Sequence, residues 1–221
     1  MPGRKPFSGQ SGPATKQKRV FHQARASQTA RRIIDAANQL LNDNCTLSNE
    51  AISEAANVSV SSIYRYFNNR SDLFAEMFRL EADNSFNRIA GEVSKLDREN
   101  YKLIIRNIIE ASAEAVTGDK KVRRSTFRNI EYEVAQEINI KFNHNLHNKL
   151  IEQISLVTNC HPRFVDTNLV MLLARLLVSI PRITVVESNE KFDPGKFFAE
   201  LTDTAADILL RIFARADSTH N

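Results

Sequence analysis

SEAANVSVSSIYRYF, residues 53–67, is expected to form two short helical segments with Asn57-Val58-Ser59 between them. Asn tolerates the positive φ that a tight turn requires, and Ser59 can cap the helix that follows. Ile63 and Phe67 are four residues apart in that second helix, so they share the face that packs inward. The stretch therefore predicts a supporting helix, a tight turn and an exposed helix, which together form a helix-turn-helix.

The exposed face of the second helix carries side chains suited to DNA. An arginine fork pairs with guanine or with a phosphate, serine hydroxyls pair with bases or backbone oxygens, and Val60 can touch a thymine methyl. Tyrosine hydroxyls reach phosphates and hold the register without reading sequence. Arg70 and the helix start at Ser71 can hold the same backbone. The predicted DNA-binding residues are Ser48, Asn49, Ser59, Val60, Ser61, Ser62, Tyr64, Arg65, Tyr66 and Arg70. An ordinary packed surface with half-buried tyrosines is the alternative.

The composition predicts an all-α protein. The 221 residues include six Gly and six Pro, half of each before residue 14, so the rest of the chain has few helix breakers. A helical pattern begins at Ser27, and Ser48, Ser59 and Ser71 can cap three further helices. The later helices are expected at about 100–116, 130–159, 164–180 ending near Pro181, and from Asp193-Pro194 to Phe213, with a basic segment at 120–128.

The N-terminus carries a concentration of positive charge. Residues 1–34 hold eight basic side chains and no acidic one, while the remainder holds 22 basic against 26 acidic residues. Residues 1–24 are rich in Gly, Pro, Ser, Gln and Lys without apolar periodicity, so we expect a disordered arm. A basic arm on a mildly acidic body indicates a polyanionic partner met at one end. A solvated tail that only aids solubility is the alternative.

Several classes of protein are disfavoured. No apolar run reaches the ~18 residues that span a bilayer, and no apolar stretch follows the basic N-terminus as in a secretory signal. Cys45 and Cys160 are too few for a disulfide framework and fit a reducing cytoplasm. There is no Gly-rich phosphate loop and no nucleophile elbow, and His144 and His147 lack the neighbours of a metal site. We therefore expect no enzyme activity, no cofactor, no metal and no membrane partner.

Residues 27–80 resemble the DNA-binding head of the tetracycline-repressor (TetR) family of bacterial transcription regulators. RRIIDAANQLLND and NEAISEAANVSVSSIYRYFNNRSDLFAEMF are similar to the family pattern Arg-x-Ile-Ile/Leu-x-Ala-Ala, Ile-Ala-x-x-Ala-Gly-Val-Ser, Leu-Tyr-x-x-Phe and Lys-x-x-Leu. The matching positions are Arg32, Ile33, Ile34, Ala36, Ala37, Ile52, Ala56, Val58, Ser59, Tyr64, Phe67, Arg70 and Leu73. Where the family has Gly, this chain has Asn44-Cys45 and Asn57; Asn supplies the same backbone freedom at some cost.

The resemblance implies a domain order and a function. It implies a helix-turn-helix DNA-binding domain at 25–72, with its motif at about 48–67, and a helical ligand-binding and dimerisation domain at 73–216 before a tail at 217–221. The implied function is a sequence-specific regulator, a repressor that binds a palindromic operator and is released by a small-molecule ligand. Such a protein would be cytoplasmic and nucleoid-associated when bound to DNA. A ligand-independent or activating regulator, or a non-specific architectural DNA-binding protein, is the alternative.

The resemblance also implies a homodimer through about 164–180 and 194–213. Independently, these two segments are apolar over more than one face, which one subunit would struggle to cover. The effector that the resemblance implies is unknown. Tyr101 and Tyr132 can line its pocket or belong to the core. Arg175 interrupts an apolar helix, and its charge there needs either an interfacial carboxylate or an anionic ligand.

Overall fold

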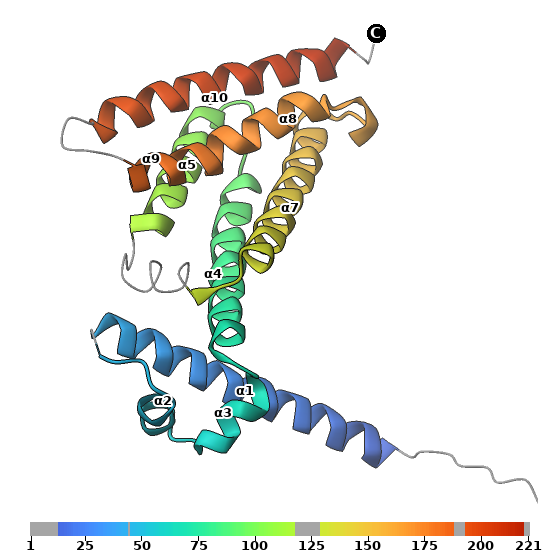
Figure 1. The fold of residues 1–221 in the computed structure, drawn as a ribbon. Coiled ribbons are helices and arrows are strands. Elements are labelled where there is room, and N and C mark those ends of the chain that lie inside the picture. The colour runs from blue at the N-terminus through green and yellow to red at the C-terminus, as the bar shows by residue number, and fades with distance from the viewer. Residues whose placement is uncertain (1–12, 44, 118–128, 188–192, 219–221) are drawn as a thin grey trace, which may run out of the picture. The chain divides into compact units, whose positions relative to one another are not determined.

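The protein is described by a computed structural model over residues 13–43, 45–117, 129–187 and 193–218. All regular structure in these ranges is helical (Figure 1), which confirms the predicted all-α class. The chain divides into two compact units, Met1–Asn69, here called the head, and Arg70–Asn221, here called the body. None of the described helices combines the length and the apolarity that a bilayer crossing demands.

The head contains three helices, α1 (Pro13–Asn42), α2 (Asn49–Ala56) and α3 (Val60–Tyr66). α1 contacts both shorter helices, and α2 contacts α3. Their common core is made of apolar side chains spaced three or four residues apart, which therefore share one face of each helix. Its buried members are Ile33, Ile34, Ala36, Ala37, Leu47, Ile52, Ala56, Ile63 and Phe67.

α1 begins at Pro13, whereas the sequence pattern predicts a start at Ser27. The expectation of a disordered arm at 1–24 is therefore wrong for residues 13–24. The reason is helix propensity: this part of the chain has no Gly and no further Pro, and Ala, Lys, Gln and Arg form helices without an apolar stripe. Proline itself is favoured in the first turn. Residues 1–12 lie outside the described part of the chain.

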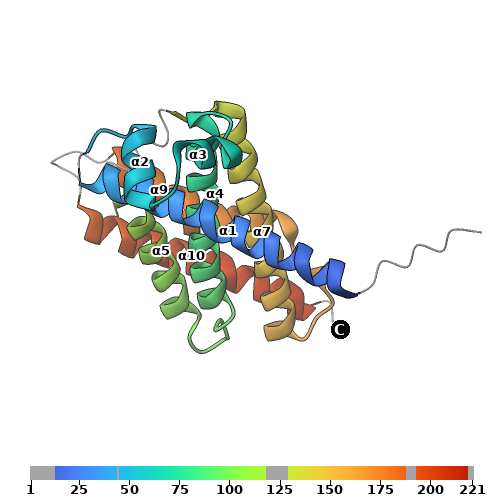
Figure 2. The ribbon, with the colours of Figure 1, turned by 90° about the horizontal axis from the view of Figure 1, so that it is seen from below.

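The body is built on three long helices, α4 (Arg70–Val93), α5 (Tyr101–Thr117) and α7 (Tyr132–Thr158). α4 lies between α5 and α7 in both views of the ribbon (Figures 1 and 2) and contacts each of them. Its core includes Ile89, Ile105, Ile109, Leu146 and Leu150. The predicted Ser71 cap is wrong, because α4 already begins at Arg70 after Asn69, whose residue type favours the N-cap as strongly as Ser. The predicted basic segment at 120–128 lies outside the described residues.

The predicted apolar helix at 164–180 is more complex in the structure. A 3-10 turn η1 (Pro162–Phe164) precedes α8 (Thr167–Ala174), a wide π turn η2 (Arg175–Ser179) follows, and α9 (Ile180–Glu187) continues past Pro181. The prediction that the helix ends near Pro181 is wrong. Proline lacks an N–H, and its ring crowds the carbonyl four residues back. The π turn, in which the Ile180 N–H donates to the Arg175 carbonyl five residues back, widens the helix directly before that ring.

The last helix, α10 (Pro194–Asp217), begins as the sequence predicts. The Asp193 carboxylate accepts a hydrogen bond from the backbone N–H of Lys196 at 3.1 Å, and Pro194 occupies the first turn. Leu201, Ala205 and Leu209 point into the body core. α10 contacts α5 and also α8, beside which it runs in Figure 1.

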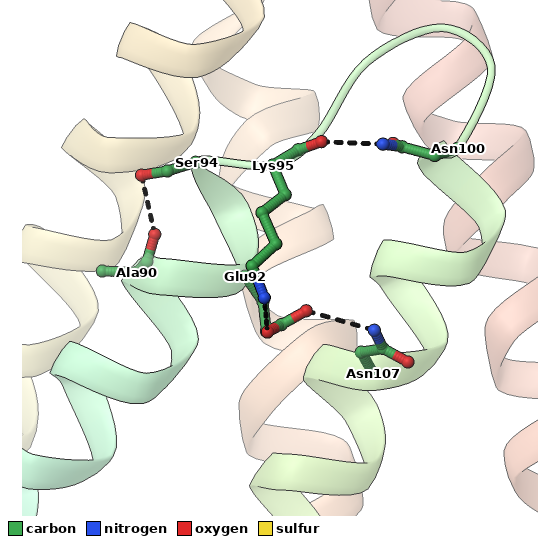
Figure 3. Close-up of polar contacts among 6 residues, drawn as sticks. All are labelled: Ala90, Glu92, Ser94, Lys95, Asn100 and Asn107. Atoms are coloured by element: carbon green, nitrogen blue, oxygen red, sulfur yellow. Dashed lines mark hydrogen bonds and ion pairs between the residues drawn. The ribbon is translucent and has the colours of Figure 1, made fainter.

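Side-chain hydrogen bonds hold the turn between α4 and α5 (Figure 3). The Asn100 side-chain amide donates to the Lys95 carbonyl at 2.8 Å. The Glu92 carboxylate accepts from the Lys95 ammonium at 2.5 Å and from the Asn107 amide at 3.1 Å. The hydrogen bond from Lys95, and then the one from Asn107, lower the pKa of the Glu92 carboxyl. Because Glu92 is on α4 and Asn107 on α5, their contact fixes the register of the two helices.

Candidate nucleic-acid interface

The turn between α2 and α3 has the predicted backbone. Asn57 adopts φ 50° and ψ 55°, in the left-handed region that Asn tolerates better than most residues. The backbone N–H of Asn57 donates to the Glu54 carbonyl, and that of Val58 donates to the Ser53 carbonyl at 3.0 Å. The two bonds satisfy the last carbonyls of α2, so the chain reverses without leaving polar groups exposed at the helix end.

A side chain from α1 locks this turn from outside. The Nη2 atom of Arg32 donates to the Asn57 carbonyl at 2.9 Å and also to the Ala56 carbonyl. The Ser53 hydroxyl donates to the Val58 carbonyl at 2.6 Å. Sequence reasoning noted Arg32 only as a match to the family pattern and missed its role. Nothing in local periodicity reveals a bond between residues so far apart in the chain.

α3 presents the predicted face outward. Ile63 and Phe67 are buried, whereas Ser61, Tyr64 and Arg65 are exposed. The Tyr64 side chain is 56% exposed. The remaining predicted residues of α3, Val60, Ser62 and Tyr66, are half-buried at its edges. The predicted orientation of the helix is therefore confirmed.

Both predicted helix caps of the head are present. The Ser48 hydroxyl accepts from the Ala51 N–H at 3.1 Å, and the Ser59 hydroxyl accepts from the Ser62 N–H at 3.2 Å. The Ser59 hydroxyl is also 2.9 Å from that of Ser61 and 2.8 Å from that of Ser62. Three hydroxyls thus cluster at the start of α3. Ser48 and Ser59 fix the ends of the helices, while the exposed Ser61 remains accessible from outside.

Asn49 orients the exposed tyrosine. Its side-chain amide donates to the Tyr64 hydroxyl oxygen at 2.8 Å. A phenol has one O–H to donate besides its acceptor lone pairs. Because Asn49 occupies an acceptor position, the Tyr64 proton is directed away from the protein. A phosphate oxygen, which only accepts, matches a hydroxyl held in this way.

Arg65 and the start of α2 set the charge on this surface. The Arg65 guanidinium donates to the Tyr66 hydroxyl at 3.2 Å and lies over the Tyr66 ring, 5.1 Å from its centroid. It is therefore held at the exposed edge of α3 before any partner arrives. At the start of α2, a backbone hydrogen bond and then the Ser48 hydroxyl lower the pKa of the Glu50 carboxyl. A carboxylate in the first turn of a helix is stabilised by the positive end of the helix dipole.

Arg70 and the three predicted ligand residues lie in the body. Arg70 is exposed as the first residue of α4 and belongs to the body, while the other nine predicted DNA-binding residues lie in the head. Of the weak ligand candidates, Tyr101 is half-buried against the body core. Tyr132 is 70% exposed and Arg175 is also exposed, so neither side chain is enclosed within the chain. Among the described residues no group of three or more His, Cys, Asp or Glu side chains is placed to hold a metal ion.

Residues 33–77, which span α2, α3 and their turn, match the model of the bacterial regulatory proteins of the tetR family. This segment is similar to the DNA-binding segment of that family. The resemblance stated from the sequence is thereby confirmed for the segment that contains the helix-turn-helix. No curated protein matches the chain significantly.

Solved structures extend the likeness of fold to the tetR-family body. The AlkX repressor of Dietzia sp. superposes with a TM-score of 0.58 at 17% identity, covering 83% of this chain and 96% of AlkX. FadR of Bacillus subtilis, solved with stearoyl-CoA, gives 0.53 at 19% identity, covering 79% and 96%. NalD of Pseudomonas aeruginosa, a secondary repressor of an efflux pump, gives 0.50 at 21% identity, covering 82% and 96%. The fold is that of the family, an N-terminal helix-turn-helix followed by a helical body.

Proposed function

We propose that this chain is a sequence-specific DNA-binding transcriptional regulator, a repressor that places α3 in the major groove of its operator. The observation that carries the proposal is the exposed face of Ser61, Tyr64 and Arg65 on a helix whose entry turn is locked by Arg32. A rigid presentation matters because each flexible side chain or loop that is ordered on binding costs free energy. No catalytic step forms part of the proposal.

The predicted residues divide into reading and positioning roles. Arg65 reads guanine or holds a phosphate, and Ser61 and Val60 approach base edges. Tyr64 and Tyr66 bind phosphates, together with Arg70, and so fix the register of the head on the duplex. Ser48, Ser59 and Ser62 hold the starts of the two helices, and Asn49 holds Tyr64.

We further propose that the protein acts as a homodimer through about 164–180 and 194–213. Support comes from apolar side chains that the single chain leaves open to solvent: Met171 is 54%, Leu172 47% and Leu210 44% exposed. These residues lie on α8 and α10, which contact each other. Two copies related by a twofold axis would cover both surfaces. They would also supply two heads to a palindromic operator, whose half-sites lie ~34–36 Å apart.

Release by a small molecule completes the proposal. FadR of Bacillus subtilis was solved with stearoyl-CoA, and EbrR is described as a multidrug binding protein solved with imidazole; both share the fold. We assign residues 25–72 to DNA binding, with the motif at about 48–67, and residues 73–216 to ligand binding and dimerisation. A ligand need only favour the conformation that misfits DNA, for which a few kcal/mol of differential affinity is sufficient. The protein would act in the bacterial cytoplasm, at the nucleoid when bound.

The test is the selection of DNA fragments by the purified protein, followed by titration of the selected site and of random duplex. We expect a palindromic site, and we expect Arg65→Ala to remove the preference for it over random DNA. Arg31→Ala is the matched control, because Arg31 is an exposed arginine of the same unit that pairs with Asp35 on α1. Equal affinity for every duplex with a steep salt dependence would instead identify an architectural DNA binder.

A further inference from the structure

A half-buried arginine of the body contacts side chains of α4 and α7 from α9. Nη2 of Arg182 on α9 donates to the hydroxyl of Ser85 on α4 at 2.7 Å, and Ser85 is buried. The guanidinium carbon of Arg182 lies 4.7 Å from the centroid of the Phe142 ring on α7. A guanidinium prefers such an aromatic face to plain aliphatic surroundings. These two contacts hold the guanidinium of Arg182 against the aromatic face of Phe142 and beside the buried hydroxyl of Ser85.

Aromatic and aliphatic side chains surround this cation. The rings of Phe86 and Phe142 meet edge to face, with centroids 6.0 Å apart. Phe142 belongs to the large core cluster of the body, together with isoleucines of α5, and the partly buried Phe86 packs against that cluster. A bound molecule would therefore meet the Arg182 guanidinium beside a large apolar surface.

Ser112 on α5 supplies a polar group whose role the fold does not explain. Its side chain is completely buried, and its hydroxyl has no hydrogen-bond partner within the described part of the protein. A buried hydroxyl without a hydrogen-bond partner destabilises the folded state. A serine in mid-helix usually donates to the carbonyl one turn earlier, as Ser94 does to Ala90. Ser112 is thus a donor that a ligand could satisfy.

The register of α4 and α5 brings the two serines to one level. The Glu92–Asn107 contact joins the helices near their shared turn. Ser85 is seven residues from Glu92, and Ser112 is five residues from Asn107. With a rise of about 1.5 Å per residue, Ser85 lies about 10 Å and Ser112 about 8 Å along the antiparallel pair from that contact. α9, which carries Arg182, packs against α5.

The backbone beside Arg182 is also unusual. The π turn η2 ends at Ser179, and Pro181 directly precedes Arg182. Single π turns within helices occur often at functional sites. Here the turn links α9 to α8, so a molecule that contacts Arg182 acts on the helix line that carries the proposed dimer surface.

We propose that the effector of this regulator is an organic carboxylate. Its carboxylate is received by Arg182 with the hydroxyls of Ser85 and Ser112, and its apolar part packs on Phe86 and Phe142. The planar fork of arginine matches a carboxylate with two parallel hydrogen bonds, and the low polarity of the surroundings strengthens them. The proposal rests on the function proposed above, because it names the chemical class that the ligand-responsive body binds.

Titration calorimetry of the full-length protein tests this class of ligand. The probes are octanoate and 2-naphthoate, with 1-octanol and 2-naphthol as neutral counterparts of the same apolar size. We expect at least one carboxylate to bind saturably and its neutral counterpart to bind at least about tenfold more weakly, as the loss of a charge-assisted hydrogen bond implies. Arg182→Gln should weaken carboxylate binding by at least about tenfold, because the charge is lost. Arg88→Gln removes an exposed arginine of α4 and should leave binding unchanged.

Ser112→Ala keeps the proposal testable if Arg182→Gln fails to fold. Removing a buried hydroxyl without a partner should raise the melting temperature of the free protein, yet weaken the carboxylate several-fold. Saturable binding of neither carboxylate, equal binding of acid and neutral probe, or unchanged binding by both variants would overturn the proposal. Operator binding by the unliganded variants is measured in parallel. Failure of the wild-type protein to recognise any operator would refute the proposed function. The calorimetry tests only the class of the ligand.

Discussion

At Tyr64, an exposed aromatic side chain is held by a single hydrogen bond from Asn49, 2.8 Å away. The bond matters because it determines in which direction the hydroxyl accepts a hydrogen bond and in which it donates one. An amide donor on one side leaves the phenol proton for an acceptor on the other, and phosphate oxygens are acceptors only. In the proposed complex, Asn49 would act through Tyr64 and favour phosphate binding without itself touching DNA.

Exchange of the donor at residue 49 tests this polarity. Asn49→Asp presents an acceptor that takes the Tyr64 proton, so we expect weaker operator binding than with Asn49→Ala. Tyr64→Phe should cost about 1 kcal/mol per subunit, the usual net value of one hydrogen bond. Operator affinities from fluorescence anisotropy measure each loss.

The charge of the new carboxylate needs a control of its own. In the Tyr64→Phe background, Asn49→Asp should retain only the repulsion of the phosphates, and Asn49→Ala should have little further effect. Equal losses by Asn49→Asp with and without the Tyr64 hydroxyl would show that charge alone acts, and would contradict the positioning role.

The turn residue Asn57 gives a second prediction at this scale. Its φ of 50° is strained for a residue with a Cβ, and Asn bears that strain better than Ala. We expect Asn57→Ala to lower the free energy of unfolding by about 1 kcal/mol and Asn57→Gly to leave it nearly unchanged or slightly higher. Chemical denaturation of both variants, with the slope compared as well as the midpoint, measures the difference. An Ala variant as stable as the wild type would argue against strain at this turn.

At the scale of elements, the α4–α5 turn illustrates how side chains set helix register. Glu92 bonds both Lys95 in its own helix and Asn107 in the next, and Gln153 of α7 donates to the Leu96 carbonyl at 2.8 Å. Three helices are therefore tied near one end of the body, and Figure 3 shows the contacts between α4 and α5. A rigid turn here would keep α4, α5 and α7 aligned along the body.

The lowered pKa of Glu92 predicts a pH dependence of stability. The folded state favours the carboxylate, so its contribution is fully present above the ordinary pKa of 4.5 and is lost as pH falls through the lower, folded value. The free energy of unfolding should therefore fall more steeply on acidification in the wild type than in Glu92→Gln. Glu110→Gln, which removes a surface ion pair with Arg106, is the control. Parallel curves for wild type and Glu92→Gln below about pH 5 would contradict the assignment.

The α8–η2–α9 line shows an element whose boundaries depend on more than propensity. Pro181 is expected to end a helix, yet the helix continues because the π turn before it takes up the strain. The same irregularity sets where Arg182 emerges. The helix thus continues through Pro181 and places the half-buried side chain of Arg182 in the body.

At the scale of the whole molecule, the proposed dimer rests on the apolar side chains that α8 and α10 leave exposed. Leu172→Lys combined with Leu210→Lys would place charges in an interface core, where they are strongly unfavourable. We expect this variant to sediment as a monomer and to lose most operator affinity, since each head alone makes half of the contacts. Sedimentation equilibrium with a DNA titration measures both effects.

Ile140→Lys provides the matched control for that variant. Ile140 is an exposed aliphatic residue, even more exposed than the interface leucines, but it lies on α7, outside the proposed surface. The control should remain dimeric with unchanged DNA affinity. Monomeric wild-type protein at all concentrations, or an unchanged mass for the double variant, would refute a dimer through α8 and α10.

The sequence by itself determined the helix-turn-helix and the all-α class. Ser48, Ser59, Asn57 and the Ile63–Phe67 pair act within a few residues of their own position, so caps, turn and buried face follow from local chemistry. The helical start at Pro13 and the passage through Pro181 were missed, because a helix without an apolar stripe and a widened turn leave little trace in periodicity.

Only the tertiary structure decided what Arg32, Asn49, Ser112 and Arg182 contact or lack. Their surroundings come from other helices, up to 97 residues away for Arg182 and Ser85. Such pairs depend on the packing angle and register of whole helices, which the cooperative core sets after the local choices have been made. Local chemistry thus fixes which residues face inward, while long-range packing decides which of them meet.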